Sequence, residues 1–327
     1  MESMGDAHLP PPSILYHYTD AAGLKGIVDG VGRSSFPTVY QAPQYSQYNF
    51  SKVIRFQASD VRFMNDRDEL RAAGRVFANL IDRSVDPCAV HEHRGHQILA
   101  RLSEELRSNG FLPDPAQVFA VCLSTEPDDL NQWRGYAGGT GGFAIGIPYA
   151  ALAAYTYPLF AFSEPMDPAL GLPPTAELFK VSYDLADIEP DAASFICAHD
   201  GAAEPFPDDI DLARFGMAKL LSRFKGPGFS GENEWRAITR FAPRGLVPVI
   251  GEVRAGRLGL MPYTAFAVNL HVGFQNRSAI RPDRTIERLI VGPGPHQDLQ
   301  IAAARQLLGM NGHDPSVVEQ SDVAFRG

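Results

Sequence analysis

The stretch that decides the fold is Val118-Phe-Ala-Val-Cys-Leu-Ser124, in which six of seven residues are apolar. A short apolar run rich in β-branched and aromatic residues is typical of a strand buried on both faces. The next such run, Gly142-Phe-Ala-Ile-Gly-Ile147, is predicted to be a second strand that ends at Pro148. We therefore expect a sheet with residues 118–124 near its centre.

Outward from this strand, the pattern predicts further strands at residues 14–19, 53–59, 178–183, 235–241, 246–253 and 286–291. Helices are predicted at residues 21–28, 66–82, 92–109, 149–155, 209–224 and 301–308. These elements mix without regular βαβ alternation, which indicates an α+β fold. Residues 1–13 are expected to be a disordered polar tail, and residues 14–327 a single domain.

Composition limits the class of protein. The chain has 327 residues, 45% of them hydrophobic and 20% charged, which suits a globular protein with a substantial core. A formal charge of −9 argues against a surface devoted to nucleic-acid phosphates. Cys88, Cys122 and Cys197 lack metal-binding or disulfide spacing, and Cys122 is expected in the core. We find no targeting segment and no membrane span, so a cytoplasmic location is the expectation.

The segment Phe229-Ser-Gly-Glu-Asn-Glu-Trp-Arg236 carries two acids two residues apart. If both lie on the strand that follows, Glu232 and Glu234 point to the same face. Two neighbouring carboxylates are costly unless a ligand, a proton or a cation resolves their repulsion. The glycines between Lys225 and Gly231 predict a mobile approach to a ligand. The alternative is a solvated strand end with ordinary surface acids.

Three further clusters have both a structural and a functional interpretation. His17, flanked by tyrosines, is either a hydrogen-bonded sheet histidine or a binding residue. Asn65 and Asp66 precede an apolar helical stripe and, with Glu69, match a capping box. Trp133 and Tyr136 would share a helical face and offer a ring for stacking a heteroaromatic ligand.

Metal and phosphate-loop motifs are not indicated. The glycines at 138–142 lack the Lys-Ser/Thr of a P-loop and do not form GxGxxG. His91 and His93 lack the i, i+4 spacing of a helical zinc site, so no metal is expected.

In this order, the clusters resemble a family of bacterial proteins named domain of unknown function 2971. The resemblance spans about residues 14–326. It rests on Leu15-Tyr-His-Tyr-Thr19, Asn65-Asp66 with Glu69, Leu123-Ser124, Trp133-Arg-Gly-Tyr136, Gly142-Phe-Ala-Ile-Gly146, Glu234-Trp-Arg236, Ile290-Val-Gly-Pro293, Ser321 and Phe325-Arg326.

More distantly, the same order resembles the ADP-ribosyltransferase superfamily, which implies a mostly antiparallel split sheet with flanking helices. By that resemblance, His17 and Thr19 hold NAD, and Tyr136 or Trp133 stacks on nicotinamide. Glu234 stabilises the oxocarbenium-like transition state, and Glu232 orients or activates the acceptor. The remaining expected binding residues are Tyr18, Ser124, Asn65 and Arg236.

The first functional hypothesis is therefore NAD-dependent ADP-ribosyl transfer, as in a toxin or phage-defence effector. NAD hydrolysis, a nucleotide-sensing module without turnover, and a metal-dependent nuclease using Asp66, Glu69 and the late glutamates are the alternatives. The expected partners are NAD as substrate and an acceptor that is a protein, a nucleic acid or a small molecule. A further expected partner is either a neutralising protein or a second copy of the chain. No membrane partner is expected.

Overall fold

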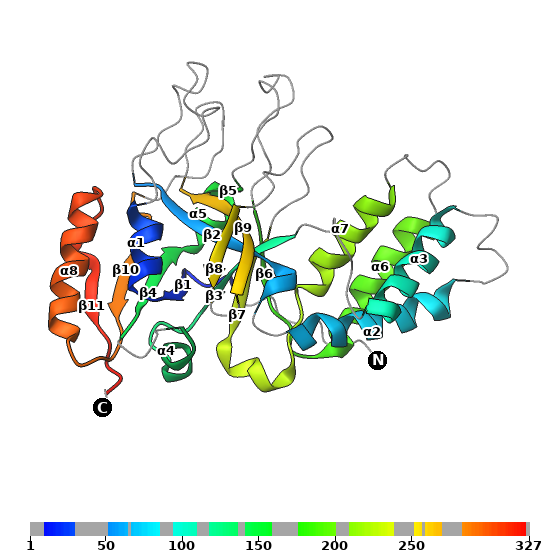
Figure 1. The fold of residues 1–327 in the computed structure, drawn as a ribbon, viewed down its shortest axis with the longest axis horizontal. Coiled ribbons are helices and arrows are strands. Elements are labelled where there is room, and N and C mark those ends of the chain that lie inside the picture. Colours follow the sequence, from blue (N-terminus) through cyan, green and yellow to red (C-terminus); the bar gives the residue numbers. More distant parts are fainter. Residues whose placement is uncertain are drawn as a thin grey trace, which may run out of the picture.

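A computed structural model describes residues 10–29, 52–64, 67–85, 94–109, 118–136, 141–158, 176–200, 209–238, 252–256, 259–269 and 283–324. These residues form a mixed α+β fold in which helices flank a largely antiparallel open sheet (Figure 1). The predicted α+β class is confirmed at this level. Asn65, Asp66 and the first nine residues of the predicted tail lie outside the described residues.

Within the described residues the sheet has eleven strands, of which eight form the path β11-β10-β4-β1-β3-β2-β9-β5. All of its strand pairs are antiparallel except β10 with β11. The strands are β1 (Ile14–Thr19), β2 (Ile54–Asp60), β3 (Phe119–Ser124), β4 (Phe143–Pro148), β5 (Thr156–Pro158), β6 (Glu177–Lys180), β7 (Glu234–Ile238), β8 (Glu252–Gly256), β9 (Gly259–Val268), β10 (Arg288–Val291) and β11 (Val318–Gln320).

Strand β3 is central, as predicted, and the sheet divides beside it. One edge of β3 pairs with β7 along its length. The other edge pairs with β1 at Ser124 and with β2 at Ala120 and Phe119. Because β1 and β2 share this edge, they separate at the middle of β3, next to Cys122. We call this place the split.

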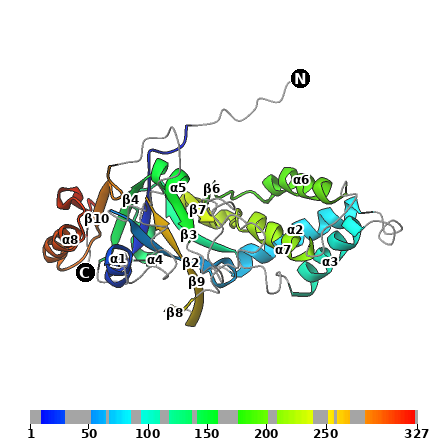
Figure 2. The same cartoon turned by 90° about the horizontal axis from the view of Figure 1, so that it is seen from above.

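Helices cover the two faces of the sheet differently. Helices α1 (Ala21–Asp29), α5 (Tyr149–Tyr155) and α8 (Gln297–Met310) share one core with the inward side chains of β1, β3 and β4. On the opposite face, α4 (Leu130–Tyr136) packs over Tyr16 and Tyr18. Helices α2 (Arg67–Ser84), α3 (Arg94–Asn109), α6 (Ile188–Asp200) and α7 (Asp209–Leu221) form a second core, which extends to one side of the sheet (Figures 1 and 2).

Two long elements differ from the sequence expectation. Strand β9 lies where no strand was expected, because its glycine, proline and alanines have weak strand propensity. It is held by pairing with β2, β5 and β8. Helix α6 was also not predicted, since Pro190 and a weak apolar periodicity disguise it. The predicted strand at 246–253 lies mostly outside the described residues, and β8 begins at its end.

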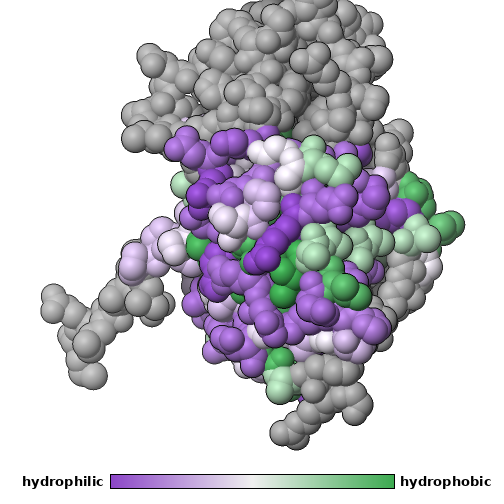
Figure 3. Space-filling view, turned by 90° about the vertical axis from the view of Figure 1, so that its left-hand side faces the viewer, coloured by the Kyte–Doolittle hydropathy of each residue, from purple (hydrophilic) through white to green (hydrophobic). Residues whose placement is uncertain are grey.

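The end of the molecule formed by α8 and β11 is largely hydrophilic, with some apolar surface (Figure 3). Leu299 and Met310 of α8 are among the exposed apolar residues. Among the described helices, none combines the length and the apolar character needed to cross a membrane.

Candidate functional site

The two late glutamates are placed differently from the sequence expectation. Residues Pro227–Glu232 form a short 3₁₀ helix, η8, in place of the mobile glycine approach that we expected. Asn233 then adopts a left-handed conformation with φ of 45°, and β7 begins at Glu234. The expectation that Glu232 and Glu234 share a strand face is therefore wrong, because Glu232 ends the turn before the strand.

The two carboxylates nevertheless meet at one cation. Lys225 Nζ donates to Glu232 Oε2 at 2.7 Å and to Glu234 Oε2 at 3.0 Å. The like-charge repulsion is thus resolved by a lysine, one of the three solutions anticipated from the sequence. Lys225 is itself almost buried and lies over the Phe229 ring.

Glu234 is also bound along its own strand. Arg236 Nε donates to Glu234 Oε1 at 2.7 Å, while Arg236 Nη1 donates to the Ser222 carbonyl at 2.7 Å. Both side chains are buried, with 3% of Glu234 and 2% of Arg236 exposed. Burial by itself would raise the pKa of Glu234, but Arg236 and Lys225 outweigh it and hold the pKa at about 2. The carboxylate is therefore ionised at physiological pH and can act as a negative charge but not as a proton donor.

Cys122 lies directly opposite Arg236 in the β3–β7 ladder, so its thiol points to the face that carries Glu234. Burial, followed by the nearby charge of Glu234, raises the pKa of the thiol well above the ordinary value. Within β3, Cys122 is the one residue that is partly exposed. Burial raises the pKa of Tyr136, and the negative charges of Glu232 and Glu234 raise it further, so Tyr136 lies near the same cluster.

His17 approaches Cys122 from the split. Tyr16 pairs with Ser124, which puts Tyr16 and Tyr18 on the Glu234 face and His17 on the other. His17 Nδ1 bonds the Cys122 carbonyl oxygen at 2.9 Å, and its ring meets Phe56 of β2 edge-on at 4.8 Å. The side chain thus occupies the space between β1 and β2.

The protonation state of His17 follows from these contacts. Burial lowers the pKa of His17 to about 4, so the ring is neutral near pH 7. A carbonyl oxygen only accepts, so Nδ1 carries the proton and Nε2 is left as an acceptor. His17 and Glu234 therefore lie on opposite sides of the β3 backbone and are connected through Cys122, rather than side by side on one face.

Three other predicted binding residues have their polar groups engaged in building the site. The Tyr18 hydroxyl donates to the Glu126 carbonyl at 2.7 Å and accepts from the Asp129 amide at 3.0 Å. Ser124 Oγ donates to the Glu232 carbonyl at 2.7 Å, which ties β3 to the turn before β7. Trp133 is 4% exposed, and its Nε1 donates to Asp128 at 2.7 Å. Of the two predicted stacking rings, Tyr136 is the one that faces the acids.

Of the two remaining predicted binding residues, the structure describes one. Thr19 ends β1, and its side chain lies against Gly23 of α1. Asn65 lies outside the described residues.

Two cations that sequence reasoning did not assign to the site complete it. Lys225 had a usable signal, since it opens the glycine segment before the acids. Arg254 had none, because β8 reaches the site only through its pairing with β9. Arg254 donates to Gln57 Oε1 at 3.0 Å and to Ser59 Oγ at 2.8 Å, both on β2.

Arg254 is a half-buried cation whose neighbours are neutral. Its Nε is buried without a hydrogen-bond partner, and burial lowers its pKa. Among the described residues no carboxylate pairs with it, and its charge also lowers the pKa of His17. The split therefore carries an uncompensated positive charge on its β2 side.

Comparisons with known proteins add no assignment. No family model, no curated protein and no solved structure matches the chain. In the part of the chain that the structure describes, there is also no group of three or more His, Cys, Asp or Glu residues that could hold a metal.

Proposed function

We propose that this protein transfers ADP-ribose from NAD, with the site centred on Cys122. The carrying observation is that Glu234 and Tyr136 lie near the partly exposed Cys122, whose carbonyl is bound by His17, while Glu232 shares Lys225 with Glu234. We further propose that the split sheet corresponds to the ADP-ribosyltransferase fold. The resemblance described above and this convergence support the proposal together.

In this reaction the bond between the ribose C1′ and nicotinamide breaks, and nicotinamide leaves as a neutral molecule. Positive charge then develops at C1′, and a carboxylate already in place favours it. Glu234 suits this role because its low pKa keeps it ionised. The acceptor's nucleophilic atom bonds to C1′ and loses its proton, for which Glu232 is the more exposed of the two carboxylate bases. With water as acceptor, the same site would hydrolyse NAD.

Binding of the negatively charged substrate would rearrange the ion pairs of the site. In the free protein Lys225 and Arg236 occupy the oxygens of Glu234. The pyrophosphate of NAD would pair with Arg254, which has no acidic partner among the described residues, and would compete with the glutamates for Lys225. Release of Lys225 would then expose the negative charge of Glu234 to the ribose. Tyr136 would supply the ring against nicotinamide.

The test is nicotinamide release by purified protein incubated with NAD. Glu234→Gln removes the charge while keeping the shape, and we expect it to slow release by about 10²–10³-fold. Glu189→Gln, an exposed acid of α6, is the matched control and should leave the rate unchanged. Circular dichroism of each variant verifies that it is folded.

A second variant tests the contribution of Tyr136 to NAD binding. Tyr136→Ala should raise the KM for NAD by removing the stacking ring while leaving the carboxylates in place. NAD binding without nicotinamide release, unchanged by Glu234→Gln, would refute the enzyme proposal and favour a sensing module. Radiolabelled NAD distinguishes transfer to an acceptor from free ADP-ribose. An activity that EDTA abolishes would favour the nuclease alternative.

A further inference from the structure

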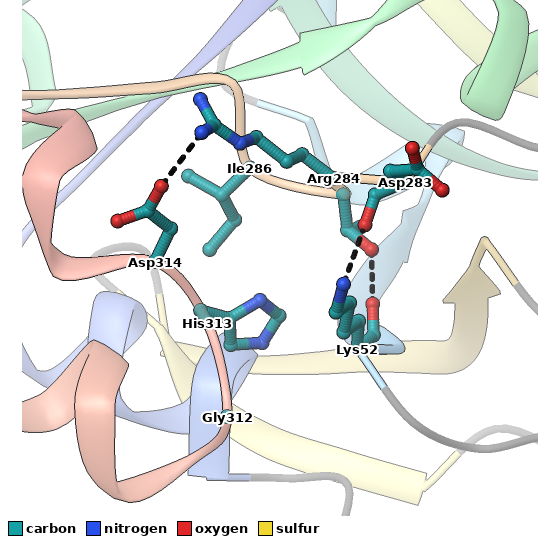
Figure 4. A pocket seen from close by; sticks show the side chains of 8 residues that line it. Lys52, Asp283, Arg284, Ile286, Gly312, His313 and Asp314 are labelled. Carbon is teal, nitrogen blue, oxygen red and sulfur yellow. Dashed lines mark hydrogen bonds and ion pairs between the residues drawn. The ribbon is translucent and has the colours of Figure 1, made fainter.

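A cavity of about 250 Å³ lies apart from the Cys122 site. Its walls come from three parts of the chain: Lys52, which lies two residues before β2; the segment leading to β10; and the turn after α8 (Figure 4). The lining residues are Lys52, Asp283, Arg284, Thr285, Ile286, Gly312, His313 and Asp314. None of them belongs to the proposed NAD site.

His313 is the most unusual of these residues. Only 7% of it is exposed, yet its ring nitrogens have no hydrogen-bond partner among the described residues. Figure 4 shows the ring lying between Asp314 and Lys52, on the cavity side of its backbone. Burial, and then the charge of Lys52, lowers its pKa, so the ring is neutral near pH 7. The ring nitrogens are not among the fully enclosed unpaired atoms of the described residues, so a ligand in the cavity could reach them.

Lys52 is the second group without a matching partner. Its Nζ donates to the Asp283 carbonyl at 2.9 Å, and within the described residues it forms no ion pair with a carboxylate. Arg284, by contrast, already pairs with Asp314 at 2.8 Å. The wall therefore offers an exposed ammonium, with no carboxylate partner among the described residues, beside a neutral imidazole.

The backbone that carries Lys52 is held in place. Lys52 has a left-handed conformation with φ of 59°, which is uncommon for a residue other than glycine. Its carbonyl accepts a hydrogen bond from Thr285 Oγ1, which in turn accepts from Asn269 Nδ2 at 2.7 Å. Thr285 and Asn269 are fully buried. These hydrogen bonds hold the backbone of Lys52 in place before a ligand binds.

We propose that this cavity binds a small phosphate-bearing molecule, held by Lys52 and His313. A phosphate monoester carries about −1.5 to −2 charges near pH 7 and several acceptor oxygens, enough to reach groups on two separate walls. A phosphate monoester that retains one proton can donate it to a neutral imidazole. A carboxylate ligand, which is ionised near pH 7, has no proton to donate. The cavity is larger than a phosphate group alone, which leaves room for a small organic part.

The experiment uses inorganic phosphate and the full-length protein, followed by calorimetry and by NMR titration of the His313 ring. We expect saturable binding together with a rise in the pKa of His313, since an anion beside the ring favours its protonated form. Lys52→Gln should weaken binding at least tenfold. Lys180→Gln, an exposed lysine of β6, should leave binding unchanged.

Two further variants keep the test independent of the NAD site and of folding. Arg254→Gln removes the cation of the NAD site and should not alter the phosphate response of His313. His313→Asn retains hydrogen bonding in a smaller side chain and should also weaken binding. Absence of saturable binding, binding unaffected by Lys52→Gln, or equally tight binding of acetate would each overturn the proposal. Loss of NAD turnover alone would not bear on it.

Discussion

At the scale of single residues, Cys122 organises the candidate site through two different groups. Its carbonyl oxygen bonds His17, and its thiol lies near Glu234 on the other side of the strand. A strand residue can serve both because its backbone and side-chain groups point in different directions. Burial keeps His17 neutral well below pH 6.5. The neighbouring cations keep the buried Glu234 ionised, although burial alone would favour its protonated form.

These protonation states predict acid sensitivity. The pKa of His17 is lowered from 6.5 to about 4 on folding, so between these values the unfolded chain binds more protons. Its contribution to stability is complete above pH 6.5 and is lost as the pH falls towards 4. Glu234, lowered from 4.5 to about 2, adds a further loss below pH 4.5.

Urea unfolding at a series of pH values measures this effect. We expect His17→Gln, which keeps a donor for the Cys122 carbonyl, to show a shallower fall in stability between pH 6.5 and 4 than the parent protein. A fall of equal steepness in both proteins would contradict the neutral buried state assigned to His17. Comparing the two proteins removes the contribution of His313, whose pKa is also lowered.

At the scale of elements, one aspartate joins two segments that are distant in sequence. Asp128, just before α4, accepts hydrogen bonds from Trp133 Nε1 at 2.7 Å, from Ser321 Oγ at 2.6 Å and from the Asp322 amide at 2.7 Å. Gly292, which follows β10, lies against the face of Trp133. Trp133, Gly292 and Ser321, three residues of the quoted resemblance, therefore form one structural contact that supports α4 and with it Tyr136.

Gly292 is predicted to tolerate no side chain. A Cβ at this position would lie 2.7 Å from Trp133 Cε3, closer than carbon atoms pack. We expect Gly292→Ala to reduce the free energy of unfolding by about 1–3 kcal/mol through overpacking. Gly135→Ala in α4 is the control, since its Cβ would meet no atom within 4 Å and should be neutral or stabilise the helix by up to about 1 kcal/mol. Chemical denaturation measures both, and equal stability of the two variants would refute the contact.

At the scale of the whole molecule, two hydrophobic cores share the central strand. Val121 of β3 belongs to the core under α1, α5 and α8, whereas its neighbour Ala120 belongs to the core of α2, α3, α6 and α7. The alternation of side chains along a strand makes this sharing possible. The helical core should therefore not unfold separately from the sheet.

Phe77→Ala tests this coupling. Phe77 is fully buried in α2, and its truncation should reduce the free energy of unfolding by about 3–5 kcal/mol. The two tryptophans of the chain, Trp133 and Trp235, both lie on the sheet, so their fluorescence reports on it. Fluorescence and far-ultraviolet circular dichroism should shift to the same lower midpoint. A tryptophan transition that stays at the parent midpoint would show that the cores unfold independently.

Local pattern by itself determined much of this protein. Strand β1 and helix α5 lie at their predicted positions, and β3, β4 and α3 lie within two residues of theirs. Apolar runs and helical periodicity are properties of adjacent residues, so the sequence is sufficient to find them. The acids near residue 234 and the aromatic residues of α4 were also identifiable, because their residue types suggest chemistry before any contact is known.

The tertiary structure alone decided which groups meet. Strand β9 exists through its pairing with three strands, and Arg254 reaches the split only because β8 pairs with it. Lys225 became the partner of both glutamates through the turn of η8 and the left-handed Asn233, which the sequence pattern did not predict. The side of β3 on which His17 lies depends on the register of β1, where one residue of slip reverses every side chain. Burial, charge pairing and register arise between segments far apart in sequence, and these set the chemistry of the site.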